Sequence, residues 1–191
     1  TAPLDGLSLA VGVVLAEALD AWVPGAVRLK WPNDLLVVTE TEAHKIGGIL
    51  IETVASPDAT RTAVIGFGIN VRNTPPLEIA GHGDVPKPLA PICLADISHP
   101  SPPLDAVLAG LLGALALGLP QFEREGFSAF QSRWWQRRAF AQDAVVARLP
   151  DGSRITGEVS AVSERGALVV KTEHGLHTLV SGEVSLRAIG A

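Results

Sequence analysis

Several residue types and patterns are scarce in this sequence, and each shortage limits what the chain can be. Cys93 is the only cysteine among 191 residues, so no disulfide can form within the chain. The N-terminus lacks a basic stretch followed by an apolar run and a cleavage site, so no secretory leader is predicted. Methionine is absent and the chain begins at Thr1, which permits removal of an initiator but equally suits a segment of a longer protein. We expect a cytoplasmic location.

Basic residues are too few and too scattered for a nucleic-acid surface. The 15 Lys and Arg are outnumbered by 20 Asp and Glu, which gives a formal net charge of −5 and a pI near 5.5. Proteins that bind nucleic acid usually cluster Lys and Arg, because these residues displace counterions from the phosphates. We therefore expect no nucleic-acid partner for this chain.

The longest uncharged run is too short to predict a membrane span. It covers residues 106–122, contains three glycines and reaches Pro120 near its end. A spanning helix needs about 20 predominantly apolar residues. We interpret this run as a buried core helix and expect no membrane partner.

Hydrophobic periodicity predicts the elements of the first part of the chain. Residues 7–22 are apolar at most helix positions, with Glu17 and Asp20 on a narrow polar face, which predicts a largely buried helix. Four β-rich runs follow at hairpin spacing and predict an antiparallel meander. These runs are residues 27–31, 35–39, 46–54 and 62–71.

The remaining sequence predicts helices and then a second, smaller domain. Residues 73–103 are crowded with Pro and Gly, which favours a long surface connection. Helices are expected over residues 104–119 and 128–138. Short β-branched runs follow, with a hairpin signal at Asp151-Gly152, and suit a small β-barrel. The predicted fold is α+β, with a mixed or antiparallel sheet flanked by helices in residues 1–140 and the barrel in residues 141–191.

Two motifs bring charged and small residues to the ends of neighbouring strands. RLKWPND covers residues 28–34, and KIGGILIE covers residues 45–52. Two lysines, a carboxylate, a carboxamide and a diglycine at strand ends suit a nucleotide phosphate and a small acid, because cations neutralise the like charges of such ligands. Lys45 opens the expected strand IGGILIE, where its ammonium group suits an acid and a phosphate, and Gly47 and Gly48 lack Cβ atoms and let the backbone approach a ligand closely.

The first motif adds a carboxylate and a carboxamide. Pro32 favours extended geometry in the residue before it, which holds Asn33 and Asp34 at a strand end. A carboxylate there suits Mg²⁺ or pyrophosphate chemistry. Lys30 alternates with Arg28, so the two share a face that suits a phosphate.

A third motif, GFGINV at residues 66–71, has glycines at alternate positions and then an amide. This leaves room for a flat ring with a hydrogen-bonding group at its rim, although glycines in a strand often mark only a bulge or close packing. Each motif alone also has a simpler interpretation, because a lysine after a turn is usually solvated and Pro-Asn-Asp is a common turn. His174 and His177 make an incomplete zinc site.

The three motifs in this order, followed by SGEVSLR at residues 181–187, resemble biotin protein ligases. The resemblance implies a biotin/lipoate ligase-like sheet and an SH3-like barrel. It implies that ATP and biotin are bound, with Mg²⁺, and that Lys45 and Asp34 are catalytic. The implied biotin-binding residues are Lys45, Gly48, Leu50 and Gly66. The implied ATP-binding residues are Lys30, Asn33, Asp34, Asn70 and Arg187. Asp34 is also the implied metal ligand, and Glu183 is a further candidate near the nucleotide.

The resemblance implies that biotin is converted to biotinyl-5'-AMP and passed to a lysine of the biotin carboxyl carrier domain of acetyl-CoA carboxylase. Biotin protein ligases also carry a loop of the Gly-Arg-Gly-Arg type well before KWPND, and only 29 residues precede Lys30 here. We therefore expect a truncated catalytic domain that is inactive alone. A lipoate ligase-like enzyme and a non-catalytic binding module stay open. Open sheet edges make a homodimer plausible.

Overall fold

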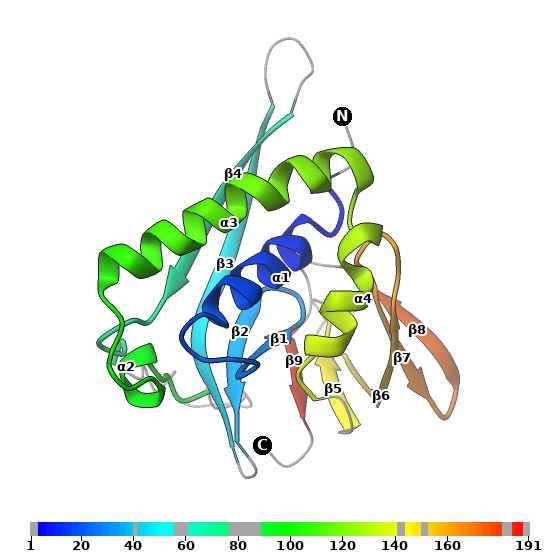
Figure 1. The fold of residues 1–191 in the computed structure, drawn as a ribbon. Helices are drawn as coiled ribbons and strands as arrows, with labels where there is room; N and C mark the ends of the chain where they lie inside the picture. Colours follow the sequence, from blue (N-terminus) through cyan, green and yellow to red (C-terminus); the bar gives the residue numbers. More distant parts are fainter. Residues whose placement is uncertain are drawn as a thin grey trace.

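An antiparallel sheet forms the centre of the first part of the chain (Figure 1). The computed structural model describes residues 4–39, 42–55, 61–76, 89–140, 144–149, 153–180 and 185–188. Four strands pair in chain order: β1 (Val27–Lys30), β2 (Asp34–Val38), β3 (Ala43–Ala55) and β4 (Arg61–Ile69). The predicted antiparallel meander is confirmed.

Helix α1 (Leu7–Leu19) lies between this sheet and helix α3 (Leu104–Glu125), as Figure 1 shows. A Cβ on Gly12 of α1 would lie 3.3 Å from the Leu29 side chain of β1, while Val14 of α1 faces Gly118 of α3. A helix with protein on both sides needs no wide polar face, which explains why α1 is apolar nearly all round. The prediction of a largely buried first helix is confirmed.

Helix α3 differs from its prediction as a buried core helix. Its buried residues, Val107, Leu111, Leu115 and Phe122, form one stripe, whereas Leu104, Leu108, Leu112 and Leu117 are exposed. Among the described residues α3 alone is long and apolar enough to cross a membrane by length and composition. The uncharged run was misleading because α1 covers one face of this helix only, so several leucines stay exposed.

Two further boundaries differ from the sequence-based expectation. Helix α3 continues through Pro120, because Phe122 is buried and contacts Phe130 of helix α4 (Ser128–Arg137) at a ring-centroid distance of 6.4 Å. The expected surface connection contains a short helix, α2 (Leu94–Ile97). Residues 77–88 of this connection lie outside the described residues.

The last part of the chain forms a second antiparallel sheet, consistent with the predicted small barrel. Its strands are β5 (Ala144–Arg148), β6 (Arg154–Val162), β7 (Leu168–Thr172), β8 (Gly175–Leu179) and β9 (Ser185–Ala188), paired in the order β8-β7-β6-β5-β9. The sequence did not predict β9, and the hairpin signal at Asp151-Gly152 lies outside the described residues. The boundary between residues 140 and 141 stays a prediction.

We expect Gly118→Ala to lower the free energy of unfolding by about 1–2 kcal/mol, because overpacking costs more than the gain in helix propensity. The new Cβ would lie 2.5 Å from Cγ2 of Val14, a stiff side chain that cannot easily move. Urea denaturation measures this change.

Gly113→Ala is the matched control on the same helix. No atom lies within 4 Å of a Cβ placed there, so helix propensity should raise the free energy of unfolding by up to about 1 kcal/mol. Equal effects of the two substitutions would contradict the close α1–α3 packing.

Candidate functional site

The carboxylate of Asp34 lies between two ammonium groups at the edge of the sheet. Lys30 ends β1 and Asp34 begins β2, and the two residues are paired across the β1–β2 turn. Asp34 Oδ2 lies 2.6 Å from Nζ of Lys30, and Asp34 Oδ1 lies 2.5 Å from Nζ of Lys45 on β3. The structure therefore brings three of the predicted site residues into direct contact, and we call them the charge cluster.

A β-bulge brings Lys45 to the charge cluster. Leu35 of β2 pairs with Gly47 of β3, but the next residue, Leu36, pairs with Lys45, so Ile46 is the extra residue of the bulge. Side chains normally alternate between faces, and a bulge reverses that alternation. As a result, Lys45 lies on the same face as Gly48, where a Cβ would be 3.3 Å from its Nζ. The sequence predicted that Lys45 opens this strand. In the structure Lys45 instead lies inside β3, which begins at Ala43.

The electrostatics of the charge cluster keep Asp34 ionised. Burial favours the neutral acid, but the charges and hydrogen bonds of Lys30 and Lys45 outweigh this effect and lower the pKa of Asp34. Two ammonium groups against one carboxylate leave an excess of positive charge. The Lys30 side chain is only 5% exposed, whereas that of Lys45 is 44% exposed, so Lys45 is the cation that a ligand can reach.

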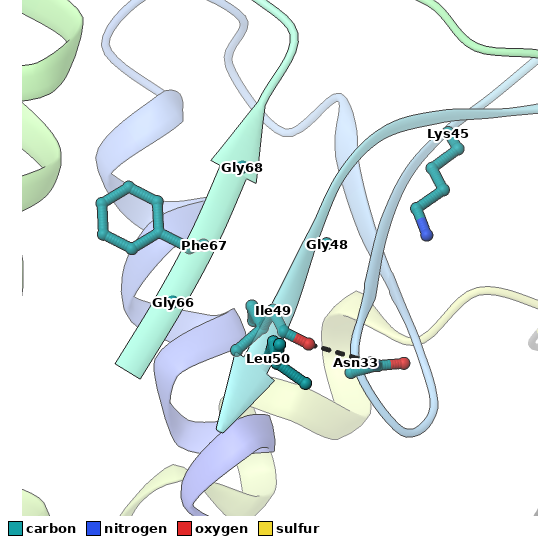
Figure 2. A pocket seen from close by; sticks show the side chains of 8 residues that line it. All are labelled: Asn33, Lys45, Gly48, Ile49, Leu50, Gly66, Phe67 and Gly68. Carbon is teal, nitrogen blue, oxygen red and sulfur yellow. Dashed lines mark hydrogen bonds between the residues drawn. The ribbon is translucent and has the colours of Figure 1, made fainter. Parts of the chain in front are cut away.

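An open cavity of about 390 Å³ lies beside Lys45 (Figure 2). Glycines on two neighbouring strands form part of its wall, because Gly48 pairs with Gly68 and Leu50 pairs with Gly66. Its lining residues are Asn33, Lys45, Gly48, Ile49, Leu50, Gly66, Phe67 and Gly68. Three of the lining residues are glycines, and an exposed leucine lies near the lysine. This lining suits a flat, largely apolar group with an anionic end.

The two glycines of KIGGILIE serve different purposes. A Cβ on Gly47 would lie 2.4 Å from the carbonyl oxygen of Gly68, so Gly47 allows β3 and β4 to approach each other. Gly48 instead faces the cavity and the Lys45 ammonium group. The sequence predicted that both glycines would let the backbone approach a ligand. Only Gly48 lies where it could do so.

The two predicted asparagines take different places. Asn33 lines the cavity, and its Nδ2 donates a hydrogen bond to the Ile49 carbonyl at 2.9 Å, shown as the dashed line in Figure 2. Asn70 is outside the lining, and its Nδ2 donates to the carbonyl oxygens of Lys45 (3.3 Å) and Ile92 (3.0 Å). Asn70 thus joins the end of β4 to the bulged strand.

The structure leaves other predicted residues apart from the charge cluster. Arg28 is exposed, and its guanidinium group donates to the Gln136 carbonyl of α4 at 3.5 Å. Glu183 lies outside the described residues, and Arg187 lies in β9 with its side chain outside the description.

Three lining residues were not singled out from the sequence: Ile49, Phe67 and Gly68. Gly68 was accessible to prediction, because residues two apart on a strand share a face and Gly66 was already a candidate. For Ile49 and Phe67 no sequence signal distinguishes a lining residue from ordinary core, since both are also packed against the core.

The donor set around Asp34 does not fit a resident magnesium ion. Both carboxylate oxygens already accept from ammonium groups, and the described residues contain no cluster of three or more His, Cys, Asp or Glu. Mg²⁺ usually binds through one or two carboxylates together with substrate phosphates. Asp34 as a magnesium ligand therefore stays a sequence-based prediction.

Comparison with known proteins finds a family match in each part of the chain. Residues 4–70 match the biotin/lipoate A/B protein ligase family, and residues 144–187 match the biotin protein ligase C terminal domain. The bifunctional ligase/repressor BirA of Salmonella typhimurium is 32% identical over 96% of this chain and 53% of its own length. The biotin--[acetyl-CoA-carboxylase] ligase of Paracoccus denitrificans is 26% identical over 93% of this chain and 71% of its own.

Solved structures agree with the sequence relatives. The biotin protein ligase of Aquifex aeolicus superposes with a TM-score of 0.76 at 27% identity, covering 97% of this chain and 75% of that protein. The same enzyme in complex with biotin and ATP gives the same TM-score and identity. The chain spans about half the length of the BirA relatives that it matches.

We expect the stability of the protein to fall in acid as Asp34 becomes protonated. A carboxyl group whose pKa is lower in the folded state contributes stability above its unfolded pKa of about 4, and this contribution is lost as the pH falls through the folded pKa. Asp34→Asn should lower the free energy of unfolding at neutral pH by about 2 kcal/mol, because a carboxamide still accepts a hydrogen bond but no longer offsets the charge of the buried ammonium group.

Urea denaturation at a series of pH values measures this effect. The difference between wild type and Asp34→Asn should shrink in strong acid, where the wild-type carboxyl group is also neutral. A constant difference across the acid range would contradict the lowered pKa.

Proposed function

Since the chain belongs to the biotin protein ligase family, we propose that it carries the substrate site of such a ligase, which converts biotin and ATP to biotinyl-5'-AMP and transfers biotin to a lysine of a carrier protein. The relatives' names support this reaction. Because the chain matches only 53% of the BirA relative, the activity of the whole protein is part of the proposal.

The observation that carries the proposal is the charge cluster beside the glycine-walled cavity. Biotin has a planar ureido ring cis-fused to a saturated sulfur-containing ring, and a carboxylate at the end of an aliphatic chain. Gly48, Gly66 and Leu50 suit the apolar part, and the exposed ammonium group of Lys45 suits the carboxylate and the α-phosphate that it must meet.

The proposed chemistry has two steps. A biotin carboxylate oxygen attacks the α-phosphorus of ATP, which forms biotinyl-5'-AMP and releases pyrophosphate. The neutral ε-amine of a carrier lysine then attacks the biotinyl carbonyl, which forms an amide, breaks the bond from the carbonyl carbon to the phosphate oxygen, and releases AMP and the amine proton to solvent. In both steps Lys45 would offset negative charge where carboxylate and phosphate meet, and Asp34 would hold Lys45 in place.

The other assignments follow the same geometry. We propose that Asn33 contacts the nucleotide, because it lines the cavity, and that Lys30 acts through Asp34, because its ammonium group is buried against that carboxylate. Asn70 would act by supporting the Lys45 backbone. Arg187 stays a sequence-based candidate for the nucleotide, and Mg²⁺ would enter with ATP.

The proposed partner is the biotin carboxyl carrier domain of acetyl-CoA carboxylase, as the name of the Paracoccus relative suggests. A cytoplasmic location fits both substrates. A homodimer stays a prediction, and so does the absence of a nucleic-acid partner for this segment. Lipoate remains a second acid to test, because the family match to residues 4–70 covers biotin and lipoate ligases alike.

We expect isothermal titration calorimetry to detect biotin binding, strengthened by ATP with Mg²⁺, and we expect Lys45→Ala to weaken it about 10- to 100-fold. This range corresponds to the loss of one charge-assisted hydrogen bond. Lys45 is half-exposed, so the variant should still fold.

Arg28→Ala is the matched control, since it removes an exposed cation of β1 that does not meet the cavity. It should bind biotin as the wild type does. Lipoate competing as well as biotin would favour the lipoate alternative. Wild-type protein that binds neither acid would contradict the proposal for this chain.

A further inference from the structure

A buried hydrogen bond joins the second sheet to the turn that carries the charge cluster. The indole Nε1 of Trp31 donates to the carbonyl oxygen of Gly166 at 3.0 Å, across 135 residues of sequence. Trp31 is 1% exposed and follows Lys30 directly, two residues before Asn33. Indole can only donate and has one polar atom, so this carbonyl satisfies its whole hydrogen-bonding capacity.

The carbonyl acceptor is itself held in a fixed position. Gly166 lies in the turn between β6 and β7, which is closed by hydrogen bonds from Gly166 N to the Ser163 carbonyl (2.9 Å) and from Ser163 N to the Ala167 carbonyl (2.8 Å). Gly166 has a φ of +78°, a conformation that favours glycine. A Cβ there would lie 2.7 Å from Cα of Gly6, so this turn packs directly on the start of α1.

The β1–β2 turn therefore has support from two other elements. From α1, the Ser8 hydroxyl group donates to the Pro32 carbonyl at 3.1 Å. From the second sheet, Gly166 accepts from Trp31. Lys30 and Asp34 flank these two contacts, so a shift of the turn would change the position of the Asp34 carboxylate relative to Lys45.

We propose that Trp31 and Gly166 position the Asp34 carboxylate, so that docking of the β6–β7 turn of the small barrel sets the affinity of the cavity beside Lys45. Neither residue lines that cavity, and both act through the β1–β2 turn. Because such coupling is reciprocal, a ligand at Lys45 also stabilises the docked barrel. The affinity part of this inference rests on the proposed function, and the positioning part does not.

Trp31→Phe tests the inference, because it keeps an aromatic ring in the core and removes the donor. We expect biotin affinity to fall about tenfold, within the usual range of coupling between sites. We also expect the pKa of Asp34, measured by carbon NMR titration of its carboxyl group, to rise toward the ordinary value. A purely structural role for Trp31 would lower stability but leave the pKa of Asp34 unchanged.

Two controls make the measurement specific. Trp135→Phe makes the same chemical change at a partly buried tryptophan of α4, and Glu173→Ala changes the exposed β7–β8 turn of the same sheet without altering the β6–β7 turn. Both should preserve the pKa of Asp34 and the biotin affinity within about twofold. If Trp31→Phe does not fold, the benzothiophene analogue of tryptophan at position 31 removes only the donor and gives the same readouts.

The outcomes separate the two proposals. An unchanged pKa of Asp34 in a folded Trp31 variant overturns the positioning inference. If wild-type protein does not bind biotin but the pKa of Asp34 rises in the variant, the proposed function fails and the positioning inference stands. Unchanged biotin affinity in the variant overturns the coupling of the barrel to the cavity.

Discussion

The candidate site depends on the position of one carboxylate. Asp34 contacts a buried ammonium group on one side and a half-exposed one on the other, so it anchors one lysine and directs the second toward the cavity. Without the carboxylate, two like charges would face each other at the strand ends, which costs energy in a partly buried place. The ion pairs therefore stabilise the strand ends and leave the half-exposed ammonium group of Lys45 beside the cavity.

Holding that carboxylate requires residues far from it in the sequence. In the turn before Asp34, the Pro32 carbonyl accepts a hydrogen bond from a hydroxyl group of α1, and the Trp31 indole donates one to a carbonyl of the β6–β7 turn. The neighbouring strand β3 is bulged, so that Lys45 lies on the same face as Asp34. Hydrophobic burial of α1 between the sheet and α3 fixes the relative positions of these elements. Packing thus sets the distances that the electrostatics need.

The sequence predicted the parts of the fold that local patterns determine. Alternating apolar runs revealed the meander, and the motif residues Lys30, Asp34 and Lys45 do meet. The bulge was not predictable, because strict alternation places Lys45 on the face of Gly47 rather than Gly48. The exposure of α3 was missed for a related reason: composition shows how apolar a helix is, but only tertiary packing decides how much of it is covered. The backbone contacts of Asn70 likewise depend on segments distant in sequence.

The matched family segments, residues 4–70 and 144–187, are connected through α4, which belongs to neither. Gln131 of α4 donates to the Val162 carbonyl at the end of β6, and just after α4 the Ala139 amide donates to the Leu29 carbonyl of β1. Arg137 forms an ion pair with Asp20, at the end of α1. Because α4 contacts both sheets and α1, it gives the barrel a second connection to the strand that leads into Lys30, besides the Trp31–Gly166 hydrogen bond. The charge cluster therefore lies on a strand and a turn that both have contacts reaching the second sheet, even though the sequence divides the two sheets.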